Sequence, residues 1–392
     1  MKILMVLDHE YPADIRIKKE AQTLIKAGHS VDLVCFTQKN RKEQEQVEGL
    51  TIFRKRISNF RLKTSVGALK FPFYFNYWLS FLSKILLNKD YDAIHVHDLP
   101  LAKVGYKLSR KHHLKFVLDL HENWPILLDL SPHTKSLLGR LLSNNKQWLL
   151  YEKKYTSLAD ALVVVAEEMK KRLLAKGVIN SNINVVPNTT DLDIFDQMKG
   201  LTTNKEYVTL FYSGGIHKHR GLEVVIKGLS QSNLPENFRF WIVGSGRNEP
   251  HIKKMVTKLN LDKHVKFWGW KSQTEVFELL LQSDITIIPH LKSEHSDNTS
   301  PNKIFHYMLG KKPIIASNCN YIQNIIKNEN CGLIYENRST QDFNDKLLYM
   351  LKNPYKWEEW GNNGYKAVKN KYNWDYTSRP LITLYNNFEN DN

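Results

Sequence analysis

Two basic side chains stand where a folded chain can bind phosphate groups. Arg220 precedes Gly221 at an expected helix start, and Lys303 lies in the first turn of a helix predicted to begin at Ser300-Pro301. Serine followed by proline is a strong helix-start signal, and free amides at such starts bind anions. A fixed guanidinium or ammonium group there stabilises charge developing on a leaving phosphate. We expect phosphate contact, although ordinary exposed helix starts also carry such residues.

His121 is the third residue that can take part in chemistry. It follows the predicted strand Phe116–Asp119, and doubly wound sheets bind ligands at the carboxyl ends of their strands. Glu122 can orient this histidine or bind a second substrate. The alternative is a histidine whose hydrogen bonds are satisfied inside a loop.

His95, His97 and Asp98 could form a metal site. Alternate positions of a strand share one face, but two histidines and one carboxylate need a further ligand. We therefore expect no metal.

The elements that must position these residues are short buried strands separated by helical patterns. A helix predicted at Ile17–Ala27 ends at Gly28, and runs of valine, isoleucine and leucine bounded by such helices indicate parallel sheets covered on both faces. The predicted strands are Lys2–Leu7, Ser30–Phe36, Ala93–Val96, Phe116–Asp119 and Ala161–Val165, then Val208–Ser213, Phe238–Val243, Val265–Phe267, Ile285–Ile288 and Pro313–Ala316. Two doubly wound units in tandem follow.

The length of 392 residues also fits two domains. A polar stretch without periodicity, Thr189–Thr203, separates the two series of strands. We predict an N-terminal domain at 1–190, a C-terminal domain at 191–370, and a C-terminal helix at 371–392 that can cross back to the first domain.

The net charge of +16 requires an anionic partner or another explanation. No acidic residue lies between Glu48 and Asp90, and the segment 53–89 interleaves basic residues with aromatic ones. Such a segment can rest on the inner surface of the cell membrane. The alternative is an ordinary loop followed by a core helix, Phe71–Leu87. No nucleic-acid motif accompanies it, so we do not expect nucleic acid as the partner.

Three scattered cysteines and an amino terminus that reads as a strand favour a cytoplasmic protein, peripheral at the membrane. No stretch of about 18–20 uncharged apolar residues occurs that could span a bilayer.

Several separate motifs, in order, resemble the retaining glycosyltransferases of family 4. They are residues 11–31, Asp119–Asn123, Val186–Asp191, Tyr212–Gly221, Val243–Gly246, Phe267–Trp270 and Ser300–Met308 with Lys312-Pro313. Each motif alone is weak, but their order and spacing over about residues 1–370 are specific. The resemblance implies the α/β GT-B fold, with two Rossmann-like doubly wound domains facing a central cleft.

The resemblance also implies roles for individual residues. His121, Arg220 and Lys303 would carry the catalysis. The residues expected to bind the donor are Asp14, Arg16, Gly214, Gly215, Gly244, Gly269, Trp270, Asn298, Ser300, Asn302 and His306. Trp268 and Trp270 flank Gly269 and can either meet the base or pack in the core.

The sequence departs from the family at several of these positions. Asn298 and His306 stand where the family usually has two glutamates, and Gly215 stands where it has a basic residue. Ala13-Asp14 replaces a glycine-rich loop, and Lys303 and Arg16 can compensate for the lost charge. These changes leave the donor sugar open and bear on activity itself.

The expected function is transfer of a sugar from a nucleotide-diphosphate sugar, a UDP-sugar, to a glycan or polyprenyl-linked acceptor in surface polysaccharide biosynthesis. The expected transferase retains the anomeric configuration and needs neither cofactor nor metal. One alternative is a UDP-sugar 2-epimerase, which needs acidic groups for elimination and re-addition that form no clear set here. Another is an inactive subunit that binds a sugar nucleotide or a membrane glycan. A nucleic-acid-binding protein, testable by salt-dependent binding, is a fourth.

Overall fold

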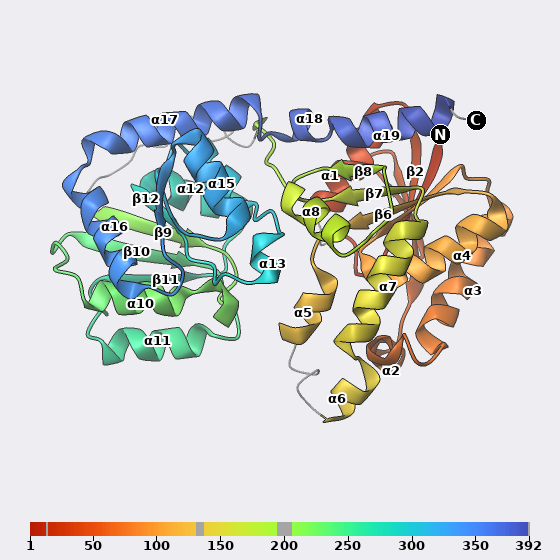
Figure 1. Cartoon of the computed structure of the whole chain (residues 1–392), viewed down its shortest axis with the longest axis horizontal. Coiled ribbons are helices and arrows are strands. Elements are labelled where there is room, and N and C mark those ends of the chain that lie inside the picture. Colours follow the sequence, from red (N-terminus) through yellow and green to blue (C-terminus); the bar gives the residue numbers. More distant parts are fainter. Residues whose placement is uncertain (13–14, 131–136, 194–205, 391–392) are drawn as a thin grey trace. The chain divides into compact units, whose positions relative to one another are not determined.

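The computed structural model describes residues 1–12, 15–130, 137–193 and 206–390. The chain forms two compact units (Figure 1). The first comprises Met1–Pro187 with Ser378–Asn392, and the second Asn188–Thr377. The sequence predicts a domain boundary after residue 190 and a C-terminal helix at 371–392. In the structure, the segment that returns to the first unit begins at Ser378.

An eight-stranded sheet forms the centre of the first unit, in the order β3-β4-β2-β1-β5-β6-β7-β8. All neighbours are parallel except the β3–β4 hairpin. The strands are β1 Lys2–Leu7, β2 Ser30–Thr37, β3 Gln44–Val47, β4 Leu50–Arg56, β5 Ala93–His97, β6 Lys115–Leu120, β7 Ala161–Val164 and β8 Ile183–Val185. The direction in which successive strands are added reverses between β1 and β5, and such a switch point is where ligands bind.

Helices cover both faces of this sheet. Figure 1 shows α1 and α19 on one side and α3, α4 and α7 on the other, in agreement with their contacts. The helices are α1 Ile15–Lys26, α2 Asn59–Lys63, α3 Phe73–Asn88, α4 Ala102–His112, α5 Trp124–Leu130, α6 Leu137–Leu142, α7 Asn145–Leu158, α8 Glu167–Ala175 and α19 Arg379–Asn390. Tyr385 of α19 is fully buried, and its hydroxyl lies 2.8 Å from His95 Nδ1, so the C-terminal helix completes this core.

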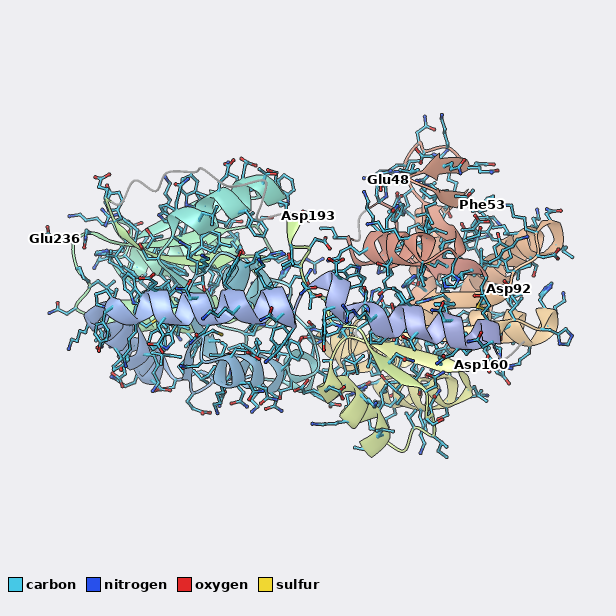
Figure 2. All side chains as sticks on the ribbon, turned by 90° about the horizontal axis from the view of Figure 1, so that it is seen from above. Glu48, Phe53, Asp92, Asp160, Asp193 and Glu236 are labelled. Carbon is cyan, nitrogen blue, oxygen red and sulfur yellow. The ribbon has the colours of Figure 1, made fainter. Side chains whose placement is uncertain are left out.

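Two aspartates hold the amino ends of strands in the first unit. Asp92 Oδ2 accepts a hydrogen bond from the Lys2 amide at 2.6 Å, and Asp160 Oδ2 accepts one from the Phe116 amide at 2.7 Å. Figure 2 shows both side chains on the same side of the unit. These carboxylates accept hydrogen bonds from backbone amides at the amino ends of β1 and β6. The candidate site lies at the opposite edge of the sheet, where the strands have their carboxyl ends.

The second unit contains a six-stranded sheet, in the order β11-β10-β9-β12-β13-β14, with all neighbours parallel. Its switch point lies between β9 and β12. The strands are β9 Val208–Ser213, β10 Phe238–Val243, β11 Val265–Gly269, β12 Ile285–Ile288, β13 Ile314–Ser317 and β14 Gly332–Tyr335. The helices are α10 Leu222–Ser230, α11 Glu249–Lys258, α12 Gln273–Gln282, α13 Glu294–Asp297, α14 Lys303–Leu309, α15 Asn320–Glu329, α16 Thr340–Lys352, α17 Tyr355–Asn370 and α18 Trp374–Thr377.

The prediction of two parallel-sheet, Rossmann-like α/β domains is confirmed, and every strand predicted from an apolar run is present. The sequence missed β3, β4, β8 and β14. Strand β4 was not predicted, because the basic residues in its second half interrupt the apolar pattern. Arg54 is nevertheless buried, because it pairs with Glu45 on the neighbouring β3 at 2.7 Å.

The basic aromatic segment 53–89 divides between core and surface. Most aromatic side chains of α3 are buried, as the core-helix interpretation expected, and Lys89 pairs with Asp32 at 2.9 Å. Phe60, Phe71 and Phe73 are exposed by 81%, 48% and 61%, beside exposed cations of the same segment. Within the described residues, no helix has the length and apolar character needed to cross a bilayer.

Candidate functional site

Glycines end three adjacent strands of the second unit. The Gly214 amide, after β9, donates to Val243 O at 2.9 Å, and the Gly244 amide, after β10, donates to Gly269 O at 2.7 Å. Gly214 has φ 135°, and a Cβ atom there would lie 2.7 Å from Lys303 Nζ. The absence of a side chain at Gly214 therefore leaves the space that the lysine uses.

Lys303 is the first residue of α14 and points its ammonium group into this edge. Its Nζ lies 4.0 Å from the centre of the Tyr212 ring, is shielded from solvent, and has no hydrogen-bond partner among the described residues. Burial, and then the charge of Arg220, hold the pKa of Lys303 well below its ordinary value. A buried ammonium group without a counter-ion is costly, so this group is suited to receive an anion.

Arg220 ends a single 3-10 turn, Lys218–Arg220, at the same switch point. The next residue, Gly221, has φ 73°, and a Cβ atom there would lie 1.8 Å from Pro289 O, so only glycine allows the turn to pack against the exit of β12. Arg220 Nη1 donates to His290 Nε2 at 2.8 Å. Among the described residues no carboxylate pairs with Arg220 or Lys303.

Histidines, rather than acidic groups, surround these cations. Burial first, then Arg220, lower the pKa of His290 well below its ordinary value and the pKa values of His219 and His295 to about 4. The neutral rings add hydrogen-bonding atoms without neutralising the cations. Sequence reasoning missed His290, although it follows the predicted strand Ile285–Ile288, whose carboxyl end reaches this edge.

The loop before α14 departs from expectation at Ser300. The prediction that Ser300 caps a helix is wrong, because α14 begins at Lys303 and its N-cap position is Asn302, whose side chain makes no capping hydrogen bond. Ser300 Oγ instead donates to the Tyr321 hydroxyl at 2.9 Å and accepts from the Asn188 amide at 3.3 Å. A long-range partner thus competes successfully with the local cap.

The two positions that usually hold glutamates are occupied in different ways. Asn298 is buried, and its Nδ2 donates to Glu294 O at 2.5 Å, which closes the short helix α13. His306 lies on α14 with its ring centre 4.9 Å from that of Phe277. Both side chains have local structural contacts, and their contact with a donor stays a prediction.

The remaining predicted donor residues of this unit lie on loops. Gly215 O accepts the Tyr212 hydroxyl hydrogen bond at 2.8 Å. Trp270, directly after Gly269, is 75% exposed, whereas Trp268 packs edge-on against Trp241, with ring centres 5.4 Å apart. The structure thus separates the two tryptophans: Trp268 packs internally, and Trp270 is available to a ligand.

His121 lies at the carboxyl edge of the first sheet, just past β6. Its Nε2 donates to Asp119 Oδ2 at 2.8 Å, its amide donates to Asp98 Oδ1 at 3.1 Å, and its Nδ1 is 3.7 Å from Asp98 Oδ2. Burial acts to lower the pKa of His121, but the Asp119 and Asp98 carboxylates outweigh it and raise the pKa to about 10. The imidazolium therefore has one N–H held by Asp119 and a second that faces Asp98 at a distance longer than a hydrogen bond.

Arg16 is buried and pairs with carboxylates of the same unit, and its contact with a donor stays a prediction. Its Nη2 lies 2.7 Å from Glu20 Oε1 and 3.4 Å from Asp119 Oδ1, and its Nη1 donates to Val186 O at 2.8 Å. Burial, partly offset by Arg16, raises the pKa of Glu20 to about 8. Arg16 thus neutralises carboxylates of its own unit, and the predicted contact of Asp14 lies outside the described residues.

His95 and His97 line the same buried cluster. Together with Glu20 and Asp119 they offer one ligand atom each, all within 4.8 Å of one another, so this donor set could hold a metal ion; Asp98, the third ligand considered from the sequence, is not part of it. Arg16 and His121 already supply positive charge to these carboxylates. That the protein needs no metal stays a prediction.

Asp8 is a further residue that sequence reasoning missed. It directly follows β1, so it lies at the switch point of the first sheet, and it accepts a hydrogen bond from the Tyr74 hydroxyl. Burial raises the pKa of Asp8 to about 6, although the hydrogen bond from Tyr74 opposes the shift. Its position after the predicted strand Lys2–Leu7 was the available signal.

Comparison with protein families accounts for most of the chain. Residues 15–194 match the model described as Glycosyltransferase Family 4, and residues 193–367 match that described as Glycosyl transferases group 1. An uncharacterised glycosyltransferase of Methanocaldococcus jannaschii is 21% identical, over 98% of this chain and 98% of its own.

Solved structures of the same architecture cover the whole chain. Sucrose-phosphate synthase from Thermosynechococcus elongatus has a TM-score of 0.81 at 17% identity and covers 100% of both chains. The Anabaena protein HepE, solved in complex with UDP, has a TM-score of 0.72 at 13% identity and covers 99% of this chain and 100% of its own. At such identities the likeness concerns the fold, which is GT-B.

Proposed function

Since the chain belongs to the family 4 glycosyltransferases and is a glycosyltransferase of the GT-B type, we propose that its donor is a UDP-sugar and that it retains the anomeric configuration. The observation that carries this proposal is the pair Arg220 and Lys303, enclosed at the switch point of the second unit with no carboxylate among the described residues to neutralise them. A diphosphate supplies the missing negative charge. UDP in the HepE structure supports the choice of nucleotide.

The proposed step needs no protein nucleophile. The acceptor oxygen bonds to the anomeric carbon while the bond from that carbon to the diphosphate oxygen breaks, and the acceptor proton passes to the diphosphate. Arg220 and Lys303 stabilise the charge that grows on the leaving group. The Nδ1–H of His121, which lies 3.7 Å from Asp98 Oδ2, would donate to a hydroxyl of the sugar being transferred.

The first unit would bind the acceptor, a glycan or a polyprenyl-linked one, in the synthesis of a surface polysaccharide. Exposed Phe60, Phe71 and Phe73, next to the exposed cations Arg61, Lys63 and Lys70, form a surface suited to anionic lipid. We propose that this surface holds the enzyme at the inner face of the cell membrane.

Incubation with a panel of nucleotide sugars tests the proposal. Free nucleoside diphosphate is measured with and without a lipid-linked acceptor extract, and with EDTA throughout. Release from one sugar, lost in His121→Ala and Arg220→Ala variants that remain folded, would support a metal-independent transferase and identify its donor.

An inactive binding subunit is the competing function, and the exchange of two glutamates for Asn298 and His306 favours it. No release from any sugar, although UDP raises the melting temperature, would establish this alternative.

A further inference from the structure

An apolar hollow adjoins the switch point of the first unit. Its volume is about 290 Å³, and its walls include Phe36, Val66, Trp124, Leu128 and Trp148. The walls come from the end of β2, the turn between α2 and α3, and the helices α5 and α7. Residues far apart in sequence thus enclose a space large enough for part of a small molecule.

Among the described residues that line the hollow, one is acidic, Asp8. Burial raises the pKa of this carboxyl to about 6, so near neutral pH it is mainly ionised and accepts hydrogen bonds. Asp98, whose charge contributes to that pKa, accepts the hydrogen bond from the His121 amide at 3.1 Å. The polar end of the hollow therefore faces the same strand edge that carries His121.

Apart from Asp8, the described walls of the hollow expose few polar atoms. This apolar lining determines which chemical groups can bind there. A sugar ring carries a hydroxyl on almost every carbon, and each hydroxyl left without a partner in an apolar site is costly. An alkyl chain or an aromatic ring instead gains by leaving water, at a rate set by its buried area.

We infer that this hollow binds an apolar group carried by the acceptor close to its reacting hydroxyl, and that Asp8 hydrogen-bonds that hydroxyl. The inference rests on the proposed function and narrows its acceptor to an amphiphilic alcohol. The segment that lines the hollow supports this, because it presents Val66 inward and Phe60, 81% exposed, outward. An acceptor anchored in a membrane by its alkyl chain can thus reach the hollow past the same segment that we propose contacts the lipid.

Calorimetric titration of the full chain with hexyl, phenyl and methyl glucosides, below the micelle concentration and without nucleotide, tests the inference. We expect hexyl or phenyl glucoside to bind at least about tenfold more tightly than methyl glucoside. Val66→Trp, which fills the hollow, should remove this preference. Ser80→Trp, at an exposed position of α3, should retain it.

Equal affinity for all three glucosides, or an unchanged preference in Val66→Trp, would overturn the inference. The rise in melting temperature caused by UDP, measured on the same samples, verifies that the second unit still binds nucleotide, and hydrogen exchange of β5 and β6 verifies that the first unit of each variant is folded. If that rise is present and the apolar preference is absent, the inference fails alone. If the preference is present but no nucleotide sugar yields nucleoside diphosphate, binding of an apolar group in the hollow is supported and the proposed transfer fails.

Discussion

The two units place cations at equivalent points of similar sheets but neutralise them differently. In the first unit, Arg16 and His121 lie against Glu20, Asp119 and Asp98. In the second, Arg220 and Lys303 meet neutral histidines and a tyrosine ring, with no carboxylate among the described residues. A neutralised site suits hydroxyl groups, whereas an uncompensated one suits a diphosphate. The shared topology therefore fixes where a ligand binds, and the local charge decides which ligand.

Removing the Asp119 carboxylate from the first unit should have the largest effect on the free energy of unfolding. Asp119→Asn leaves Arg16 and His121 buried with less negative charge, and breaking such a pair costs about 3–5 kcal/mol. Hydrogen exchange of β5 and β6 should report this loss, while Asp90→Asn, at an exposed position, should not. Unchanged protection in Asp119→Asn would show that the carboxylate does not hold the network.

Removing a cation from the second unit should act on binding. Arg220→Met deletes a charged partner of the diphosphate, worth about 2–4 kcal/mol, or roughly 30- to 1,000-fold in the dissociation constant of UDP. Lys218→Met, an exposed neighbour on the same turn, is the matched control. Similar UDP affinity in the two variants would exclude Arg220 from the phosphate site.

The pH dependence of stability should identify His121. Its pKa rises from 6.5 to about 10 on folding, so its contribution is complete below pH 6.5 and is lost as pH rises through 10. The free energy of unfolding should fall by up to about 1.4 kcal/mol per pH unit in this window. Glu20, with a pKa of about 8, adds to the slope below pH 8.

His121→Gln should flatten the decline between pH 8 and 10 in denaturant titrations that follow the first unit. The same decline in the variant and the wild type would assign it to other groups.

Lys303→Met should separate stability from function. Because the buried ammonium group has no counter-ion among the described residues, its removal should raise the melting temperature of the free protein by about 2–4 °C, equivalent to about 1 kcal/mol. The variant should also lose most of the stabilisation by UDP. A lower melting temperature would mean that the charge has a partner in the native protein.

Gly215→Arg restores the basic residue that the family usually has and should have the smallest effect. A Cβ atom at Gly215 would lie 2.9 Å from His217 Cδ2, the end of a side chain that can move. One added cation near the diphosphate should tighten UDP binding about three- to tenfold, which corresponds to about 0.7–1.4 kcal/mol. Weaker binding in calorimetry would indicate that the loop cannot accommodate a side chain.

Residues at the ends of strands could be predicted from the sequence, because the strands themselves could. The apolar runs ending at Ser213 and Asp119 defined two sheet edges and placed Gly214 and His121 on them. Lys303 and Arg220 followed from neighbouring motifs. The positions of these four residues at strand ends and helix starts depend on local patterns, which can be found in a single sequence.

Long-range pairing could not be predicted. Arg16 meets Asp119, more than a hundred positions away, and this contact places Arg16 in a buried ion-pair network. Ser300 lost its expected capping role to Tyr321 for the same reason. Charge neutralisation inside a unit depends on which helices meet which strands, and no local pattern encodes it.

Titration of the full chain with uridine, UMP and UDP tests the electrostatic difference between the units most directly. We predict that affinity rises with each phosphate, that the rise disappears in Arg220→Met, and that it persists in Asp119→Asn once folding is verified. Equal affinity for uridine and UDP, or loss of the phosphate dependence only in Asp119→Asn, would contradict the assignment of the diphosphate to the second unit.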